Sequence, residues 1–270
     1  MTRGFLAALL TVALAVPAWA DVTITSSTSG KGMGMSNDGT TTTYIKGMKM
    51  RTDMKTGDRV HTTIFDLDAQ KMYSFDNKKK EADVWDMQAF AQQLNDNVQI
   101  QDMKATIEPN GQTKQIAGKT AQGYDMNVSM PAAMGGNKDM TMTVNLTGPV
   151  WIVKGAPGTE DWARFYRAAA EKGWIFTDPR AAKGSPGQAR SMTEMYRLMA
   201  DIGGVAYGSE IEVKMEAGEG GGGGFGGMLG GLMKKMGGVT ASTEVQSVDT
   251  SGLADDLFTP PAGYKLKQQK

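Results

Sequence analysis

The 270-residue sequence contains no cysteine and only one histidine, His61. The lack of cysteine excludes disulfides and the attachment of a lipid at a lipobox. The serine-hydrolase elbow, the phosphate-binding loop and the HExxH zinc motif are also missing. Asp66 and Asp68 put two carboxylates on one strand face, a pattern more typical of a solvated surface than of a site. We therefore predict that the protein is not an enzyme and that His61 is a structural strand residue.

Neither sign of charge is in excess, and no apolar run is long. Lysine and arginine number 29, as do aspartate and glutamate, so the chain lacks the basic surface that nucleic-acid binding requires. The apolar stretch at residues 5–16 is too short to span a membrane. It follows Arg3 and precedes the sequence Ala-Trp-Ala at 18–20, which predicts a signal peptide over residues 1–20, cleaved after Ala20. We expect a periplasmic or secreted protein with a single domain over residues 21–270.

The alternation of apolar and polar residues predicts β-strands through much of the chain. Val22 and Ile24 share one face of the first strand, and turn signals recur at the short spacing of an antiparallel meander. Asn110–Gly111 is a two-residue turn signal, which predicts a hairpin. Strands are expected at 103–108, 113–116, 123–130, 139–146, 150–154, 210–216 and 239–248.

Three helices are also expected. Asp86 is placed to cap a short helix at residues 87–94, and Thr159 to cap a helix that ends at Gly173. A capping box that begins at Ser191 predicts the third helix. Together these elements predict an α+β fold, in which a large curved antiparallel β-sheet, a half-barrel, has a few helices covering its concave face.

Five short motifs resemble a known family. They lie at residues 47–51 (GMKMR), 66–68 (DLD), 114–119 (KQIAGK), 148–151 (GPVW) and 258–264 (FTPPAGY). Together they resemble the bacterial secreted family labelled domain of unknown function 4412, which has no established activity. The resemblance implies a half-barrel similar to the periplasmic lipoprotein carriers, whose concave apolar face holds acyl chains. It carries no functional residue over to this chain.

Methionine is abundant, with 21 residues. Three Met-x-Met pairs place two thioethers on one strand face, and the candidate ligand-binding residues are Met48, Met50, Met140 and Met142. Three interpretations stay open for these pairs. They are packed core, the lining of an adaptable apolar cavity, or a Cu(I) site built from soft thioether ligands.

The segment at residues 217–238 is rich in glycine but carries apolar residues at helical spacing. This stripe consists of Phe225, Met228, Leu229, Leu232, Met233 and Met236. Four glycines lie within it, and each costs about 1 kcal/mol relative to alanine in a helix. We therefore expect the helix to form only where something covers the stripe. The stripe is the candidate for a lid or a transient membrane contact, and an inert flexible hairpin insertion is the alternative.

These observations favour a non-catalytic binder or carrier of a lipid or other apolar small molecule, without a cofactor. Two alternatives remain. One is a methionine-rich Cu(I)-binding protein. The other is an envelope module that docks a protein partner through a sheet edge or through the glycine-rich segment.

Overall fold

The computed structural model describes residues 21–32, 35–97, 104–134, 137–174, 195–217 and 239–269. These residues form one open sheet of 12 strands in the order β12-β6-β5-β4-β3-β2-β1-β11-β10-β9-β8-β7. The strands are β1 (Val22–Gly32), β2 (Met35–Lys46), β3 (Lys49–Thr56), β4 (Arg59–Asp66), β5 (Lys71–Asp76), β6 (Glu81–Asp86), β7 (Lys104–Ile116), β8 (Lys119–Met134), β9 (Asn137–Lys154), β10 (Gly204–Ala217), β11 (Val239–Asp249) and β12 (Lys265–Gln268). The helices are α1 (Met87–Asn97), α2 (Thr159–Glu171), the 3₁₀-helix η1 (Asp255–Phe258) and a helical stretch at residues 195–202.

Two meanders build the sheet. Strands β1 to β6 pair in sequence order, as do β7 to β11, and every pair within the meanders is antiparallel. The two meanders join where β1 pairs with β11. The last strand, β12, adds to the β6 edge as the parallel neighbour. The predicted antiparallel character of the sheet is therefore confirmed.

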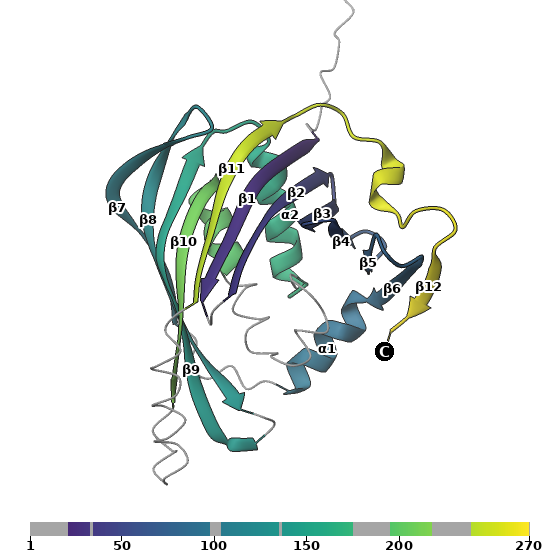
Figure 1. Ribbon diagram of the computed structural model, residues 1–270, viewed down its shortest axis with the longest axis horizontal. Helices are drawn as coiled ribbons and strands as arrows, with labels where there is room; N and C mark the ends of the chain where they lie inside the picture. The colour runs from purple at the N-terminus through teal and green to yellow at the C-terminus, as the bar shows by residue number, and fades with distance from the viewer. Residues whose placement is uncertain are drawn as a thin grey trace, which may run out of the picture.

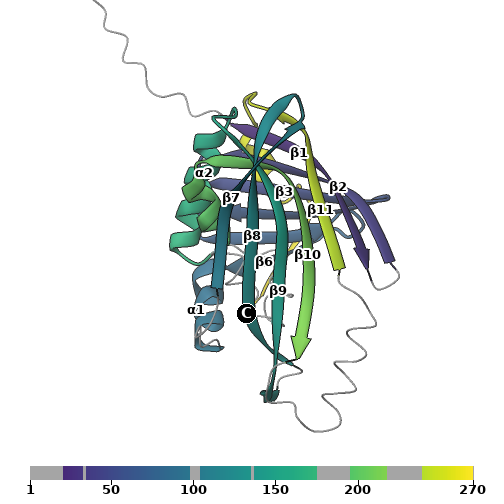
Figure 2. The same cartoon turned by 90° about the vertical axis from the view of Figure 1, so that its left-hand side faces the viewer.

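The sheet is curved, and two helices lie within its curve. Figure 1 shows α2 inside the bend of the sheet and α1 below it, and Figure 2 shows both helices on the same side of the sheet. In Figure 2 the strand direction also turns strongly between β8 and β2, as the twist of a large sheet requires. The predicted fold class, a curved antiparallel sheet with few helices, is confirmed. Among the described residues, no helix is long and apolar enough to cross a membrane.

The predicted hairpin at Asn110–Gly111 was wrong. Residues 104–116 form one strand, with an irregular register between Pro109 and Thr113, and the chain reverses instead at Ala117–Gly118. Both residues of that turn have positive φ, 48° and 72°, as a type I′ turn requires. Asn110 accepts a hydrogen bond from the backbone N–H of Gln112 and donates one to Asp125, so its side chain stabilises the irregularity within the strand.

Strands predicted separately at 139–146 and 150–154 are one strand, β9. The Gly148–Pro149 pair between them looked like a break because proline cannot donate a ladder hydrogen bond. It stays within the ladder, where Gly148 pairs with Met126 and Pro149 with Asp125 of β8. On its other side, β9 runs along β10. The predicted strands at 210–216 and 239–248 do pair with each other, as parts of β10 and β11.

The helix boundaries follow the sequence signals in part. The Asp86 carboxylate accepts a hydrogen bond of 2.8 Å from the Ala89 N–H, which confirms the predicted cap of α1. Thr159 does not cap α2, because its hydroxyl donates to the Ala156 carbonyl oxygen and the N-cap is Gly158. Gly173, with φ of 67°, ends α2 as predicted.

The convex face of β2 to β5 is covered by the C-terminal segment. Figure 1 shows this segment leaving β11, running along the outside of the sheet through η1 and ending beside β6. Its Phe258 is buried against Ile64, Phe75 and Ala82. The Tyr264 ring meets the Phe75 ring edge to face at a centroid distance of 5.3 Å. The chain therefore supplies its own cover for this face.

Candidate functional site

A cavity of about 330 Å³ lies between the concave face of the sheet and the helices. The sheet contributes one wall through side chains of β1 to β4, β10 and β11, and α2, Trp174 and the 195–202 helix contribute the opposite wall. The described lining residues are Ile24, Ser26, Thr28, Thr41, Thr43, Met50, Thr52, Met54, Thr63, Phe65, Trp162, Phe165, Tyr166, Ala169, Trp174, Tyr196, Val205, Ala206 and Thr243. All of them are uncharged.

The sheet wall is banded, because cross-strand partners on one face form rows perpendicular to the strands. One row, the apolar row, is formed by successive partners that are all buried and apolar. It consists of Val22, Ile45, Met50, Phe65, Met72 and Trp85. The next row on the same face, the hydroxyl row, consists of Thr43, Thr52, Thr63 and Ser74. Ser26 and Thr41, which pair with each other, add hydroxyls in a third row.

Most of these hydroxyls have no hydrogen-bond partner among the residues that the structure describes. Ser26, Thr41, Thr43, Thr52 and Thr63 make no side-chain hydrogen bond to any other described residue. Ser26 is only 8% exposed and Thr63 only 6%. None of these hydroxyl oxygens is a fully enclosed atom without a partner, so the oxygens that bond to no residue are open to the cavity space. The cavity therefore presents polar groups that no described residue satisfies.

The helix wall is aromatic. Tyr166 is its centre, because its ring lies 4.2 Å from that of Trp162, 5.6 Å from that of Phe165 and 4.7 Å from that of Tyr196, centroid to centroid. The Phe165 contact is edge to face and the Tyr196 contact is stacked. Such aromatic pairs contribute to stability beyond the effect of the area that they bury.

Burial raises the pKa of both tyrosines in this wall. Desolvation raises the pKa of Tyr166 well above its ordinary value of 10.0, and the neighbouring Tyr196 raises it further. Desolvation also raises the pKa of Tyr196. Both phenols therefore stay protonated under any physiological condition, and they offer hydrogen bonds without charge.

Ion pairs and hydrogen bonds fix the helices over the cavity. The Arg167 guanidinium of α2 donates to the Ala200 carbonyl oxygen at 2.8 Å and lies 3.6 Å from the Asp201 carboxylate. At the C-terminus of α2, the N–H groups of Gly173 and Trp174 donate to the carbonyl oxygens of Ala170 and Ala169. This Schellman arrangement places Trp174 back against the cavity.

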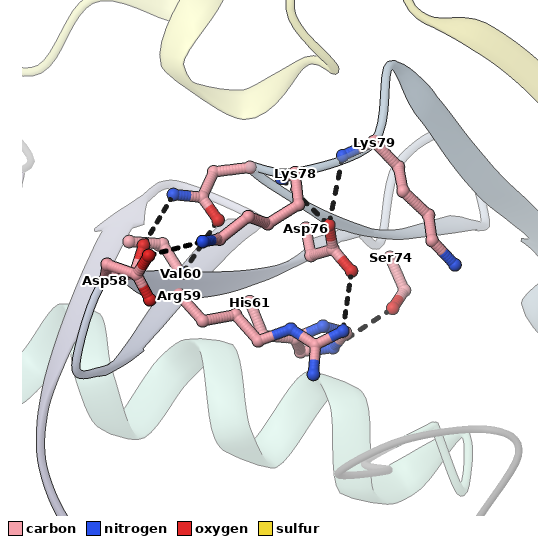
Figure 3. A network of polar contacts seen from close by, with 9 residues as sticks. Asp58, Arg59, Val60, His61, Ser74, Asp76, Lys78 and Lys79 are labelled. Carbon is pink, nitrogen blue, oxygen red and sulfur yellow. Dashed lines mark hydrogen bonds and ion pairs between the residues drawn. The ribbon is translucent and has the colours of Figure 1, made fainter.

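His61 lies beyond the cavity, in a polar network that Figure 3 shows. Its Nε2 atom is 3.2 Å from the Ser74 Oγ atom, and its cross-strand partner is Asp76. The Asp76 carboxylate accepts hydrogen bonds from Arg59 and from the backbone N–H groups of Lys78 and Lys79. Partial burial acts to raise the pKa of Asp76, but these hydrogen bonds outweigh it and lower that pKa.

This network does not resemble a nucleophile with its base. Ser74 is fully buried, so a substrate has no access to its hydroxyl. Asp76 is bound by Arg59 and the following turn rather than oriented toward His61. Within the described residues, no group of three or more histidine, aspartate or glutamate side chains is placed to hold a metal ion.

The structure separates the methionines that the sequence grouped. Met50 lines the cavity, whereas Met48 lies in the turn before β3 and packs against the core, so the two are not both strand residues as predicted. Met140 and Met142 belong to β9, five strands from β3 in the sheet. Met54, two positions after Thr52 on the same face, lines the cavity as well and is 52% exposed at its edge.

The hydroxyl row was not predicted from the sequence. Thr43 ends a run of threonines at residues 40–43 and Thr63 follows Thr62, so the residue types alone do not say which threonines face the cavity. Trp162, Phe165, Tyr166 and Tyr196 fall within the second and third expected helices, but the sequence did not indicate that they form the wall of a site. The stripe from Phe225 to Met236 and the predicted signal peptide lie outside the described residues.

Comparisons with known proteins give no relative: no family model matches the chain, and no curated protein matches it significantly. The resemblance to the family of unknown function stays a prediction.

Proposed function

We propose that the protein is a non-catalytic binder or carrier, which holds an uncharged and mainly apolar small molecule or acyl chain in the cavity beneath α2. The observation that carries the proposal is a cavity with an aromatic wall, an apolar row and no charged lining residue among those described. Concave sites of this kind, with few polar groups, are typical of small-molecule binding. The volume of about 330 Å³ lies near the lower end of the usual range, about 300–1,000 Å³.

The adaptable side chains at the cavity support binding rather than packing alone. Met50 and Met54 have flexible, polarisable thioethers that adjust to ligands of different shape. The predicted signal peptide and the family resemblance favour a periplasmic or secreted carrier. In this proposal the stripe from Phe225 to Met236 serves as a lid or a transient membrane contact when the ligand is exchanged.

Binding of N-phenyl-1-naphthylamine, an uncharged probe that fluoresces in apolar surroundings, tests the proposal. We expect saturable binding to the purified protein and quenching of tryptophan fluorescence by energy transfer. Substitution Ala206→Trp fills the cavity and is expected to abolish binding. The control is Thr240→Trp, at an exposed position of the neighbouring strand β11 on the face opposite to that of Thr243, which is expected to bind as the unmodified protein does.

Native mass spectrometry of protein purified from its producing cells is the second measurement, with a bound small molecule as the expected result. A protein that carries no molecule and takes up no probe would overturn the proposal. Stoichiometric uptake of Cu(I) that is lost on combining Met48→Leu with Met50→Leu would instead favour the copper hypothesis.

A further inference from the structure

We infer that the ligand is an uncharged amphiphile, an alkyl or aryl body that bears hydroxyl, ester or amide groups along one side. This inference rests on the proposed binding function and names its ligand class. The carrying observation is the three threonines of the hydroxyl row, on adjacent strands, which line the cavity next to Met50 and Phe65 and whose hydroxyls have no partner among the described residues.

The position of the hydroxyls indicates direct recognition. Thr43, Thr52 and Thr63 are successive cross-strand partners, and all three line the cavity. Adjacent strands lie about 4.8 Å apart, so the row presents a hydroxyl at each such step. A molecule with a single polar end would satisfy one of them. A molecule with several neutral donors or acceptors along one side satisfies the row.

The apolar row fixes where the rest of the ligand lies. Met50 lies two residues before Thr52 in β3, and Phe65 lies two residues after Thr63 in β4. Two residues span about 6.7 Å along a strand. The hydroxyl groups of a ligand and its apolar body therefore contact separate bands of the same wall. Across the cavity, the rings of Trp162 and Tyr166 offer flat apolar surface.

The electrostatics of the lining select against charge. A carboxylate or phosphate needs a cationic partner once it leaves water, and an ammonium needs an anionic one. The described lining residues supply neither. Arg59 and Asp76 lie near His61 and form an ion pair with each other at 3.3 Å. Each charge of this pair is therefore already balanced by the other. A neutral head group meets no such penalty.

Displacement of N-phenyl-1-naphthylamine by three amphiphiles of equal chain length tests the inference. The competitors are 1-dodecanoylglycerol, dodecanoate and dodecyltrimethylammonium, each used below the concentration at which it forms micelles. We expect the neutral glycerol ester to displace the probe at a concentration at least about tenfold lower than either charged competitor needs.

Substitutions that remove only the hydroxyls give the second arm. Thr43→Val and Thr52→Val keep the side-chain shape, and each is expected to weaken the binding of 1-dodecanoylglycerol by about 2- to 12-fold, as for a neutral hydrogen bond. The control is Thr42→Val, in the same strand but on the opposite face, with no expected effect. Circular dichroism and urea unfolding establish that each variant is folded.

The outcomes are distinguishable. If the protein takes up the probe but the valine variants bind the ester equally well or more tightly, this inference is overturned and the proposed function stands. Equal or tighter binding would mean that the hydroxyls contribute no hydrogen bond to the ligand. Equal displacement by the charged competitors would overturn it as well. No probe uptake by the unmodified protein would overturn the proposed function itself.

Discussion

Thr62 and Thr63 are neighbours in β4, but they point to opposite faces of the sheet and have different surroundings. Both are buried, with exposed fractions of 3% and 6%. On the convex face, the Thr62 hydroxyl donates to the Asp53 carboxylate at 2.7 Å. On the concave face, Thr63 lines the cavity and its hydroxyl has no partner among the described residues.

Other polar side chains on the convex face also have partners within the chain, as Thr62 does. On the convex face, Arg51 donates to Asp53 at 2.9 Å and to the Leu257 carbonyl oxygen at 3.0 Å, which ties the sheet to the C-terminal segment. Lys46 likewise donates to the Leu253 carbonyl oxygen at 2.6 Å. Polar groups on the convex face are therefore satisfied by the chain itself. On the concave face Ser74 contacts His61, but the hydroxyls of Thr43, Thr52 and Thr63 have no partner among the described residues, which is the basis of the binding proposal.

The largest expected effect is a loss of stability, without a loss of binding, on substitution of a buried residue of the convex face. Phe258→Ala removes a fully buried ring from the convex face, and the free energy of unfolding is expected to fall by about 3–5 kcal/mol. Urea unfolding measures this loss. Probe affinity of the folded variant is expected to stay unchanged, because Phe258 lies on the other side of the sheet. The control, Leu266→Ala at a 52% exposed position, is expected to change stability by less than about 0.5 kcal/mol.

The two neighbouring threonines give the sharpest test of the comparison. Thr62→Val removes a hydrogen bond to a carboxylate and is expected to lower the free energy of unfolding by about 1–3 kcal/mol, with unchanged ligand affinity. Thr63→Val removes no bond within the described protein, so it is expected to leave stability within about 0.5 kcal/mol. Paired urea unfolding curves measure both. Equal losses of stability would show that the hydroxyls of the two faces are satisfied alike.

A smaller effect is expected at high pH from the aromatic wall. The raised pKa values of Tyr166 and Tyr196 mean that, above their ordinary pKa of 10.0, the folded state binds more protons than the unfolded state. Stability from these groups is complete below pH 10 and falls as the pH rises above it. Unfolding by urea at about pH 9 and about pH 11 measures the slope. Replacing both tyrosines by phenylalanine is expected to flatten it, and an unchanged slope would contradict the assigned cause.

The sequence predicted the fold class because local signals agreed with the global arrangement. The alternation of apolar and polar residues identified most strands. Asp86 marked the start of α1 because its carboxylate accepts a hydrogen bond from the first turn, and Gly173 marked the end of α2 because it adopts a positive φ. Thr159 had the right residue type for a cap, but the chain before it places glycine at that position, with φ of 76°. The hairpin predicted at Asn110–Gly111 was wrong because the same residues also stabilise an irregular strand. In both cases a local signal had two structural solutions.

The site was less predictable than the fold. The hydroxyl row takes one residue from each of four strands, and only the pairing register places Thr43, Thr52 and Thr63 side by side. Methionine drew attention through its abundance, but abundance does not determine position, and Met48 and Met50 occupy different environments. Residues that form a site across strands carry no fixed spacing in the sequence, so composition alone did not indicate them.

The pairing of β1 with β11 has a consequence for how the protein folds. Each meander contains mostly contacts between neighbouring strands, whereas the junction joins residues such as Ser27 and Glu244, which are 217 positions apart. Closing so long a loop is slow relative to local pairing. Because Thr28 of β1 lines the cavity beside its partner Thr243 of β11, the cavity wall is complete only after this junction forms. Under the proposed function, binding of the probe would therefore report on the completion of folding, and a chain interrupted before β11 would lack the strand that joins the two meanders.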